Sequence, residues 1–214
     1  MLLRDCVGRK IGNAVHLFTH RNEVNRLNEA ELEKLSGKEH TFRATDRVKS
    51  GNKGYLRMLQ NSTTAPENLV LKRDAQIILL KTLDVSKGLV NGARGEVSGF
   101  SGQGFPIITF ASGERRTLAP MKFKIFMGNV EVASRAEVPC CLGWALSVHK
   151  SQGMSIDVAS LHLKNVFEFG QVYVALSRAR SLNNLQLDCH LDKQRVRAHP
   201  RVAEFYKKSC KFES

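Results

Sequence analysis

Two short stretches of the chain carry residue types that bind phosphate. "HKSQG" at 149–153 combines cationic and amide side chains with a glycine, and "SRAR" at 177–180 places Arg178 and Arg180 two residues apart. Guanidinium and ammonium groups hydrogen-bond phosphate oxygens, and an arginine can stabilise the charge that develops during phosphoryl transfer. The residues therefore raise two alternatives: contacts to a phosphate-bearing ligand, or ordinary solvated positions on helices.

The second stretch follows an apolar pattern that predicts a helix. Its apolar residues recur at helical spacing and form one stripe that must face a core: Val172, Ala175, Leu176 and Ala179. At about 100° per residue, Arg178 and Arg180 would lie about 200° apart and flank that stripe. Only one of them could then point into a given cleft, and the alternative that both are solvated helix charges stays open.

The first stretch is typical of a helix end. Leu142, Ala145 and Leu146 would share one helix face, Lys150 would fall in the last turn, and Gly153 stands just beyond it. Helix termination does not explain the histidine at 149 or the Gln-Gly pair. The residues alone leave a structural and a functional interpretation open.

The surrounding elements alternate between strand and helix at both ends of the chain. We predict a buried strand in 14–20 and a helix over 21–35, and later strands in 158–163 and 185–191 with helices over 170–182 and 199–208. Between about 69 and 139 the pattern changes to short β-branched and aromatic runs separated by glycines, which suggests a small barrel or sandwich. The polar stretch 47–68 is interpreted as the connection between the region of alternating strands and helices and the β-rich region.

Composition limits the class of protein. The 214 residues are 42% hydrophobic, enough for a packed core, and contain no apolar run long enough for a membrane span and no secretory signal. A net charge of +13, spread along the chain, favours a polyanionic partner such as nucleic acid, with a basic, solubilising surface as the alternative. Five cysteines without C-x-x-C spacing argue against a disulfide framework or a zinc site, so no metal ligand is predicted.

Two features of nucleotide-hydrolysing proteins are absent from the sequence. It contains neither G-x-x-x-x-G-K-[ST] nor an Asp-Glu pair that could serve as an acidic magnesium ligand. The glycine-dense stretch 88–104 lies between predicted strands, where hairpin turns explain it better than a phosphate loop.

Taken together, four stretches resemble the Pif (petite integration frequency) family of superfamily-one 5′-to-3′ DNA helicases, of the animal type. "LFTHRNEVNRLNEAEL" resembles helicase motif IV, "WALSVHKSQGMSID" motif V and "GQVYVALSRARSL" motif VI, while 71–97 resembles a strand segment of the inserted SH3-like barrel. The resemblance covers about 15–206, in the family's order. One departure is Arg73-Asp74, where the family usually has a glycine.

The resemblance implies a fold and a division into domains. The expected fold class is α/β, a RecA-like parallel-sheet domain with an inserted small all-β SH3-like barrel. Residues 1–65 and 138–214 would form two segments of the second RecA-like helicase domain, and 66–137 the inserted domain. The chain would be the C-terminal half of the helicase and would lack the first RecA-like domain.

The resemblance also implies roles for particular residues. Arg178 matches the arginine finger, which reaches the γ-phosphate of ATP. The expected nucleotide-binding residues are Gln152, Gly153, Arg180 and Tyr173. The expected DNA-binding residues are Thr19, His20, His149, Lys150, Ser151 and Ser155.

The implied cofactor is ATP with Mg²⁺, held mainly by the first RecA-like domain, so this chain alone should hydrolyse no ATP. Its implied partners are single-stranded DNA and that domain, with no membrane, and it is expected to be a monomer. The parent would act in DNA repair, recombination and telomere maintenance, in the nucleus, the mitochondrion or both.

A second class of function fits the same composition. A non-enzymatic module that binds single-stranded nucleic acid would display aromatic side chains on strands as a stacking platform. The candidates are Phe100, Phe105, Phe110, Phe123 and Phe126. The alternative for these phenylalanines is that they form the core of the β region.

Overall fold

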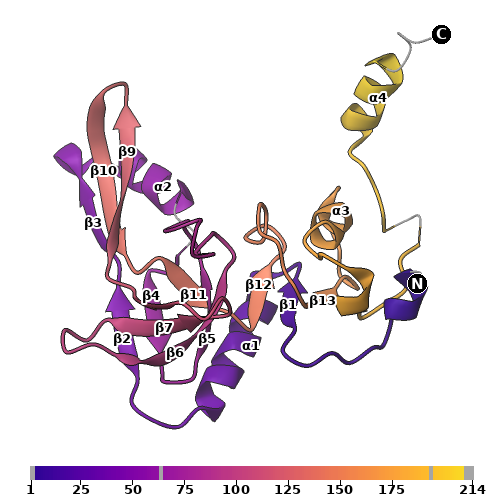
Figure 1. Cartoon of the computed structure of the whole chain (residues 1–214). Coiled ribbons are helices and arrows are strands. Elements are labelled where there is room, and N and C mark those ends of the chain that lie inside the picture. Colours follow the sequence, from indigo (N-terminus) through magenta and orange to yellow (C-terminus); the bar gives the residue numbers. More distant parts are fainter. Residues whose placement is uncertain (1–2, 63–64, 193–194, 210–214) are drawn as a thin grey trace. The chain divides into compact units, whose positions relative to one another are not determined.

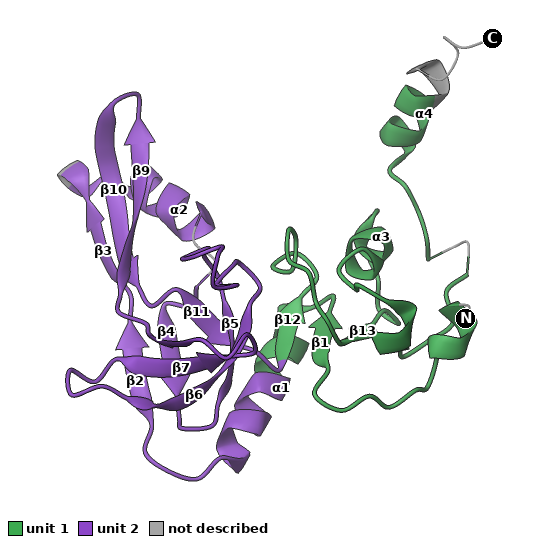
Figure 2. Ribbon diagram, in the orientation of Figure 1, with its two compact units in different colours: residues 1–26, 145–214 green, residues 27–144 purple. Residues whose placement is uncertain are grey.

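A computed structural model describes residues 3–62, 65–192 and 195–209 (Figure 1). The chain forms two compact units, one of residues 1–26 with 145–214 and one of residues 27–144 (Figure 2). These limits differ from the expected segments, because residues 27–65 group with the β region. The reason is strand pairing: β2 (His40–Arg43) pairs with β4 (Asn68–Leu71), and β3 (Thr45–Val48) pairs with β10 (Val130–Glu137).

The first unit is built on a parallel sheet. Its order is β12 (Ala145–Ser147), β1 (Val15–Phe18), β13 (Ala159–His162) and β14 (Leu185–Leu187), and every neighbouring pair is parallel. Val15, Leu17 and Leu161 are fully buried in it. Parallel strands covered on both faces are expected to be rich in apolar residues, and these short strands bury apolar side chains while also carrying polar ones such as His16 and Ser160. The sheet confirms the expected mixed α/β class with parallel strands.

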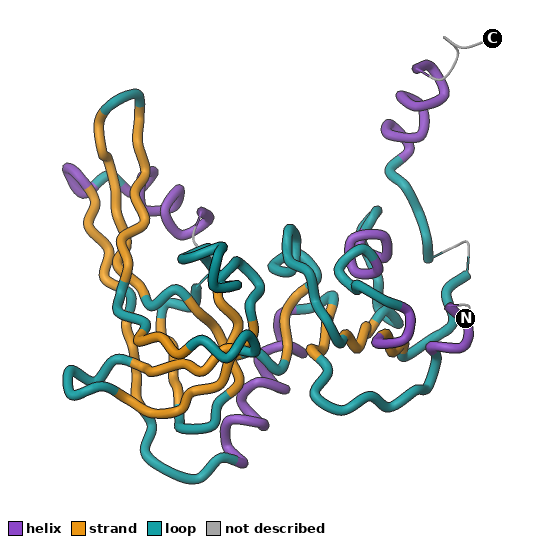
Figure 3. Tube along the Cα trace, in the orientation of Figure 1, coloured by secondary structure: helices purple, strands orange, loops and turns teal. Residues whose placement is uncertain are grey.

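Helices and loops complete the first unit. It contains the 3-10 helices η1 (Leu3–Cys6) and η3 (Leu182–Asn184), the helices α3 (Gln171–Leu176) and α4 (Pro200–Ser209), and the start of α1 (Arg21–Lys34). None of the helices in the described ranges has the length and apolar character that a membrane crossing needs. The connections from β12 to β13 and from β13 to α3 are loops and turns (Figure 3).

Two predicted helices are wrong. Residues 145–147 form a strand of the parallel sheet, and turns rather than a helix follow it, because the apolar residues pair with β1. The helix expected over 170–182 ends at Leu176, since residues 178–180 leave it to pair with Ile156. Arg178 and Arg180 therefore do not flank a helical stripe, although Val172 and Ala175 are buried as expected.

The second unit contains antiparallel sheets. A five-stranded sheet has the order β11 (Cys140–Leu142), β5 (Gln76–Leu79), β6 (Arg94–Phe100), β7 (Pro106–Phe110) and β8 (Arg115–Thr117). A three-stranded sheet has the order β3, β10 and β9 (Met121–Met127), and β2 with β4 forms the remaining pair. Across the described residues these strands close into no barrel, so the expected small barrel is not found.

The stretch 47–68, expected to be a polar connection, is partly structured. It contains the end of β3, the 3-10 helix η2 (Lys49–Gly51) and helix α2 (Lys53–Ser62), which packs against β3, β9 and β10. Leu59 of α2 is fully buried and Leu56 is half-buried, so apolar side chains anchor this helix.

An apolar cluster forms a core in the second unit. It includes Leu71, Ile77, Leu89 and Ile108, all fully buried, and it recruits Leu32 from α1. Among the described residues, Cys6, Cys140, Cys141 and Cys189 form no disulfide, and Cys210 lies outside those residues. Burial is the main cause that raises the pKa of the Cys140 thiol far above its usual range.

Candidate functional site

Loops leave the sheet of the first unit at the carboxyl ends of its strands. Residues 19–20 follow β1, 148–158 follow β12, and 163–170 follow β13. Because all these strands are parallel, their carboxyl ends meet at one edge, where ligands of open α/β sheets bind. Every site residue expected from the sequence lies in these loops or in residues 173–180, which the loop after β12 contacts.

The loop after β12 is held by its own polar contacts. The Ser151 amide donates to the carbonyl of Ser147 at 3.1 Å, and its buried hydroxyl donates to the carbonyl of Val148 at 2.7 Å. Gly153 has a φ of 78°, a left-handed conformation that other residues rarely adopt. Gly153 therefore allows the chain to turn at this point. The Ser151 hydroxyl is already engaged in a hydrogen bond within the protein.

Arg178 joins this loop to the segment after α3. Its Nη1 atom donates to the carbonyls of Met154 at 3.0 Å and Ser151 at 3.5 Å, and Nε donates to the carbonyl of Val174 at 3.1 Å. Nη2 donates to the Ser177 hydroxyl at 2.9 Å. A guanidinium has five N–H donors, so most of them are committed to the chain.

Backbone contacts reinforce the same junction. The Ile156 amide donates to the carbonyl of Arg178 at 2.8 Å, and the Arg180 amide donates to the carbonyl of Ile156 at 3.4 Å. This parallel bridge fixes Arg178 and Arg180 against the loop after β12. The two stretches that the sequence singled out are therefore brought together by the fold.

The remaining nucleotide-binding candidates lie on the surface. The side chain of Arg180 forms an ion pair with Asp157 at 2.9 Å, with both side chains more than half exposed. Tyr173 is 72% exposed, and Gln152 and Gly153 are exposed as well. All four can be reached by a ligand, whereas Arg178 is half-buried.

The DNA-binding candidates divide into buried and exposed groups. Thr19 is buried, and its hydroxyl donates to the carbonyl of Asn165 at 3.2 Å. The His20 ring stacks on Phe167 with centroids 4.8 Å apart, and His149 Nε2 lies 2.8 Å from a carboxylate oxygen of Glu168.

The other three candidates lie along the loop after β12. Lys150 is half-buried, and its backbone amide donates to the Ser147 hydroxyl at 3.3 Å. Ser155 is exposed, while Ser151 is buried with its hydroxyl bonded as described above. Of the six DNA-binding candidates, Thr19 and Ser151 thus use their hydroxyls within the chain.

Sequence reasoning missed the loop after β13. Phe167 and Glu168 contact two of the predicted residues, and Phe167 and Phe169 are 51% and 47% exposed. The available signal was the run "VFEFG", whose aromatic residues alternate with an acidic one immediately before a predicted helix.

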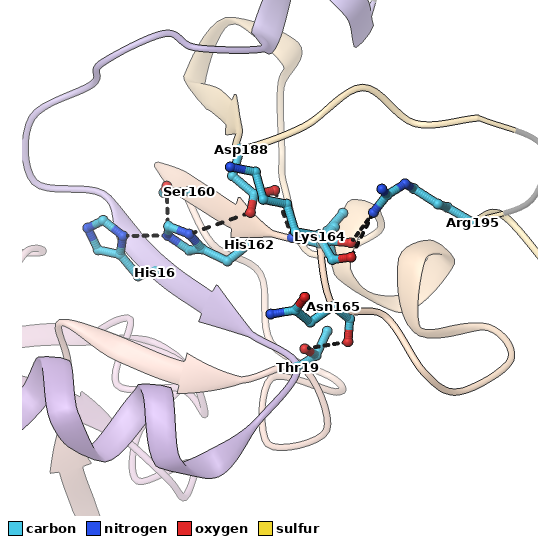
Figure 4. Close-up of polar contacts among 9 residues, drawn as sticks. His16, Thr19, Ser160, His162, Lys164, Asn165, Asp188 and Arg195 are labelled. Carbon is cyan, nitrogen blue, oxygen red and sulfur yellow. Dashed lines mark hydrogen bonds and ion pairs between the residues drawn. The ribbon is translucent and has the colours of Figure 1, made fainter.

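Sequence reasoning also missed a polar network across the sheet (Figure 4). Nδ1 of His16 lies 2.9 Å from Nε2 of His162, which is also 3.4 Å from the Ser160 hydroxyl, and His162 Nδ1 lies 4.0 Å from Asp188. Burial, with a contribution from His16, lowers the pKa of His162 below its ordinary value. The pair of rings therefore favours a neutral His162.

The phenylalanines of the second unit form no shared exposed platform. Phe110 is buried in the core, Phe100 stacks on His40 at 3.6 Å, and Phe123 lies under the Lys81 ammonium at 4.9 Å. Phe105 is half-buried, and Phe126 is 53% exposed. Within the described ranges, no group of three His, Cys, Asp or Glu side chains is arranged to hold a metal ion.

Comparison with known proteins agrees with this fold. Residues 54–100 match the family model "DNA helicase Pif1, 2B domain". The chain is 42% identical over 202 residues to the human ATP-dependent DNA helicase PIF1, covering 94% of this chain and 31% of that protein.

Solved structures give the same result. The Pif1 helicase from Candida albicans matches with a TM-score of 0.75 and 27% identity over 97% of this chain and 53% of that one. Bacteroides Pif1 bound to ssDNA matches with a TM-score of 0.66 and 24% identity, over 98% of this chain and 49% of that one, and shows the shared fold. Bacteroides Pif1 has also been solved with ADP-AlF4.

The parallel sheet and these structural neighbours define a mixed α/β protein with a RecA-like parallel sheet. Over more than nine-tenths of its length the chain is homologous to Pif1 helicases. It spans about a third of the length of the curated vertebrate relatives it matches.

Proposed function

We propose that this chain supplies one side of the ATP cleft and part of the DNA track of an ATP-dependent 5′-to-3′ DNA helicase. The observation that carries the proposal is the contact of Arg178 with the loop after β12, through the carbonyls of Ser151 and Met154. This contact links a cation suited to phosphate with a loop that carries the exposed residues His149 and Ser155.

In the proposed mechanism Arg178 is the arginine finger. Its guanidinium would exchange carbonyl acceptors of the chain for oxygens of the γ-phosphate, where it would stabilise the charge that develops during transfer. Releasing Ser151 and Met154 would free the loop after β12 to move. A nucleotide-dependent change at Arg178 would thereby reach the residues proposed to touch DNA.

The described residues suit a nucleotide only in part. Gln152, Gly153, Arg180 and Tyr173 are exposed near the Arg178 junction and could hold phosphate and ribose or base edges. Among the described residues no group of three or more His, Cys, Asp or Glu side chains is placed to hold a metal ion. By the family resemblance, Mg²⁺ would be held mainly by a separate domain that carries the phosphate loop. When bound, ATP supplies the γ-phosphoryl group, and hydrolysis of the bond that holds this group drives unwinding.

The proposed DNA track follows the exposed part of the same edge. His20, His149, Lys150 and Ser155 would contact the phosphate backbone, which makes binding independent of sequence and sensitive to salt. The structure of Bacteroides Pif1 bound to ssDNA supports this choice of partner. Thr19 and Ser151 would position the track through their internal hydrogen bonds.

Steady-state ATPase assays of a full-length helicase that contains this segment test the proposal. We expect Arg178→Ala to lower DNA-stimulated kcat by about 10³-fold or more, because an arginine finger contributes on that order. Single-strand binding should be largely retained. Arg180→Ala is the comparison variant, because Arg180 is proposed to bind the nucleotide and not to act as the arginine finger, so its effect on kcat should be smaller. A loss with Arg180→Ala but none with Arg178→Ala would refute the assignment.

We further propose that the isolated chain hydrolyses no ATP, because the cleft needs residues from two domains. Robust DNA-stimulated turnover by the purified chain would contradict this. By the same resemblance, we propose a monomeric parent that acts in DNA repair, recombination and telomere maintenance, in the nucleus, the mitochondrion or both. Fractionation of cells that express a tagged full-length parent would test the compartment.

A further inference from the structure

The three-stranded sheet of the second unit carries a row of polar side chains. Register places Ser134 of β10 opposite Arg47 of β3 on one side and Lys124 of β9 on the other. Directly paired residues point to the same face, and so does Lys122, two residues before Lys124. Three cationic side chains and one hydroxyl therefore share one face of this sheet. Figure 1 shows its strands β3, β10 and β9 side by side.

One carboxylate, that of Glu131 in β10, lies beside these cations and is already paired with one of them. Glu131 lies 2.7 Å from Lys124, and it also accepts a hydrogen bond from Ser134. The bond from Lys124 is the main cause that lowers the pKa of Glu131, so this carboxylate is ionised and paired. Glu131 is thus committed mainly to Lys124, and its charge also attracts Lys122 without forming a salt bridge with it.

Arg47, Lys49 and Lys122 are the cations that remain. All three are exposed, and none of them forms a salt bridge within the part of the chain that the structure describes. They line one shallow hollow of about 270 Å³ together with Glu131, Ser134 and the strand residues between them. Like charges held close together repel each other, so an anion in this hollow would relieve an unfavourable arrangement.

The hairpin beside the hollow ends in apolar side chains. Phe126, Met127 and Val130 at the turn between β9 and β10 are each about half exposed. Exposed apolar residues next to unpaired cations suit a ligand with both anionic and aromatic parts, since bases stack on aromatic rings while phosphates bind cations. A nucleic-acid strand has both parts, whereas a free phosphate has one.

We propose that Arg47, Lys49 and Lys122 bind a phosphodiester of a nucleic-acid backbone, with Phe126 against a neighbouring base. This site consists of residues other than those proposed at the sheet edge of the first unit. The inference rests on the proposed function, because the nucleic acid is taken to be the DNA that the proposed helicase binds. The shared ligand chemistry is the phosphate group, which free inorganic phosphate could also supply.

The test is fluorescence anisotropy of a labelled oligothymidylate with the full chain over a range of salt concentrations. Replacing the three cations, as Arg47→Gln/Lys49→Gln/Lys122→Gln, should reduce the slope of log K against log salt by about 2, since each single-strand phosphate contact contributes about 0.7. At low salt the affinity should fall by about tenfold or more. Phe126→Ala should weaken binding while leaving the salt slope unchanged.

The matched control removes the same charge elsewhere on the second unit. Lys38, Arg115 and Arg116 are exposed, and Lys38→Gln/Arg115→Gln/Arg116→Gln should retain the wild-type slope. An equal loss in both triple variants would overturn the site, because the effect would then be one of net charge. Circular dichroism of both variants verifies that they fold.

Three further outcomes separate the possibilities. If the wild-type chain binds DNA and the Arg47/Lys49/Lys122 variant binds equally well, this site is wrong while the proposed function survives. If the wild-type chain binds no DNA, the proposed function itself fails. Competition by millimolar inorganic phosphate as effective as competition by unlabelled oligonucleotide would show a simple anion site and overturn the nucleic-acid assignment.

Discussion

The guanidinium of Arg178 donates a hydrogen bond to the carbonyl oxygen of Met154 across 3.0 Å. These residues lie on different sides of β13 in the sequence, and the contact joins the segment after α3 to the loop after β12. Met154 is buried, so its carbonyl depends on partners within the protein. Arg178 therefore stabilises the loop, whatever it does for a nucleotide.

This contact predicts a stability effect that is independent of catalysis. Arg178→Ala should lower the free energy of unfolding by about 1–2 kcal/mol, because a half-buried hydrogen bond from a charged donor is lost. Urea unfolding of the isolated chain measures it. The exposed Arg180 is the control, and Arg180→Ala should change stability by no more than about 0.5 kcal/mol. Equal effects of the two substitutions would contradict the structural role.

The buried hydroxyl of Thr19 gives a second prediction. Thr19→Val keeps the shape of the side chain but leaves the Asn165 carbonyl without this donor, at a cost of about 1 kcal/mol in unfolding free energy. Thr19→Ser should preserve the bond. If Thr19→Val weakens DNA binding without changing stability, the hydroxyl acts on DNA instead.

The His16 and His162 pair predicts a pH dependence. Because burial lowers the pKa of folded His162 below its ordinary 6.5, the unfolded chain binds its proton more readily. Stability should thus be fully present above about pH 7 and fall as the pH drops through 6.5 toward the folded pKa. Urea unfolding at a series of pH values measures the slope.

Removing the ring should remove part of that slope. His162→Asn should flatten the dependence of unfolding free energy on pH below 6.5, while His190→Asn, at an exposed position, should leave it as in the wild type. An unchanged slope in His162→Asn would show that other groups cause the acid sensitivity.

The ion pair of Arg135 and Asp46 predicts a large effect in the second unit. Arg135 Nε and Nη2 donate to the two oxygens of Asp46 at 2.6 and 2.7 Å, and the arginine side chain is 5% exposed. Asp46→Ala leaves a buried cation without this partner and should cost about 3 kcal/mol. The double variant Asp46→Ala/Arg135→Met should recover much of the loss in calorimetric stability. If the double variant recovers no stability, the loss in Asp46→Ala comes from packing and not from the unpaired charge of Arg135.

Local sequence patterns predicted much of the first unit. The strand at Val15–Phe18, the helix Arg21–Lys34 and the helix Pro200–Ser209 follow from apolar spacing and end signals that act over a few residues. Local patterns gave wrong predictions at Ala145–Ser147 and after Leu176. There, pairing with β1 and with Ile156 outweighs a helical pattern, and no local signal reports such pairing.

The sequence by itself determined the family, the alternation of strand and helix, and the residue types suited to phosphate. Only the tertiary structure decided which of those residues meet: Arg178 with the carbonyl of Met154, His20 with Phe167, and Arg47 with Lys122 around one hollow. The physical reason is the distance along the sequence over which each kind of signal acts. Composition and periodicity act along the chain, whereas strand order and register bring together residues that are far apart in sequence.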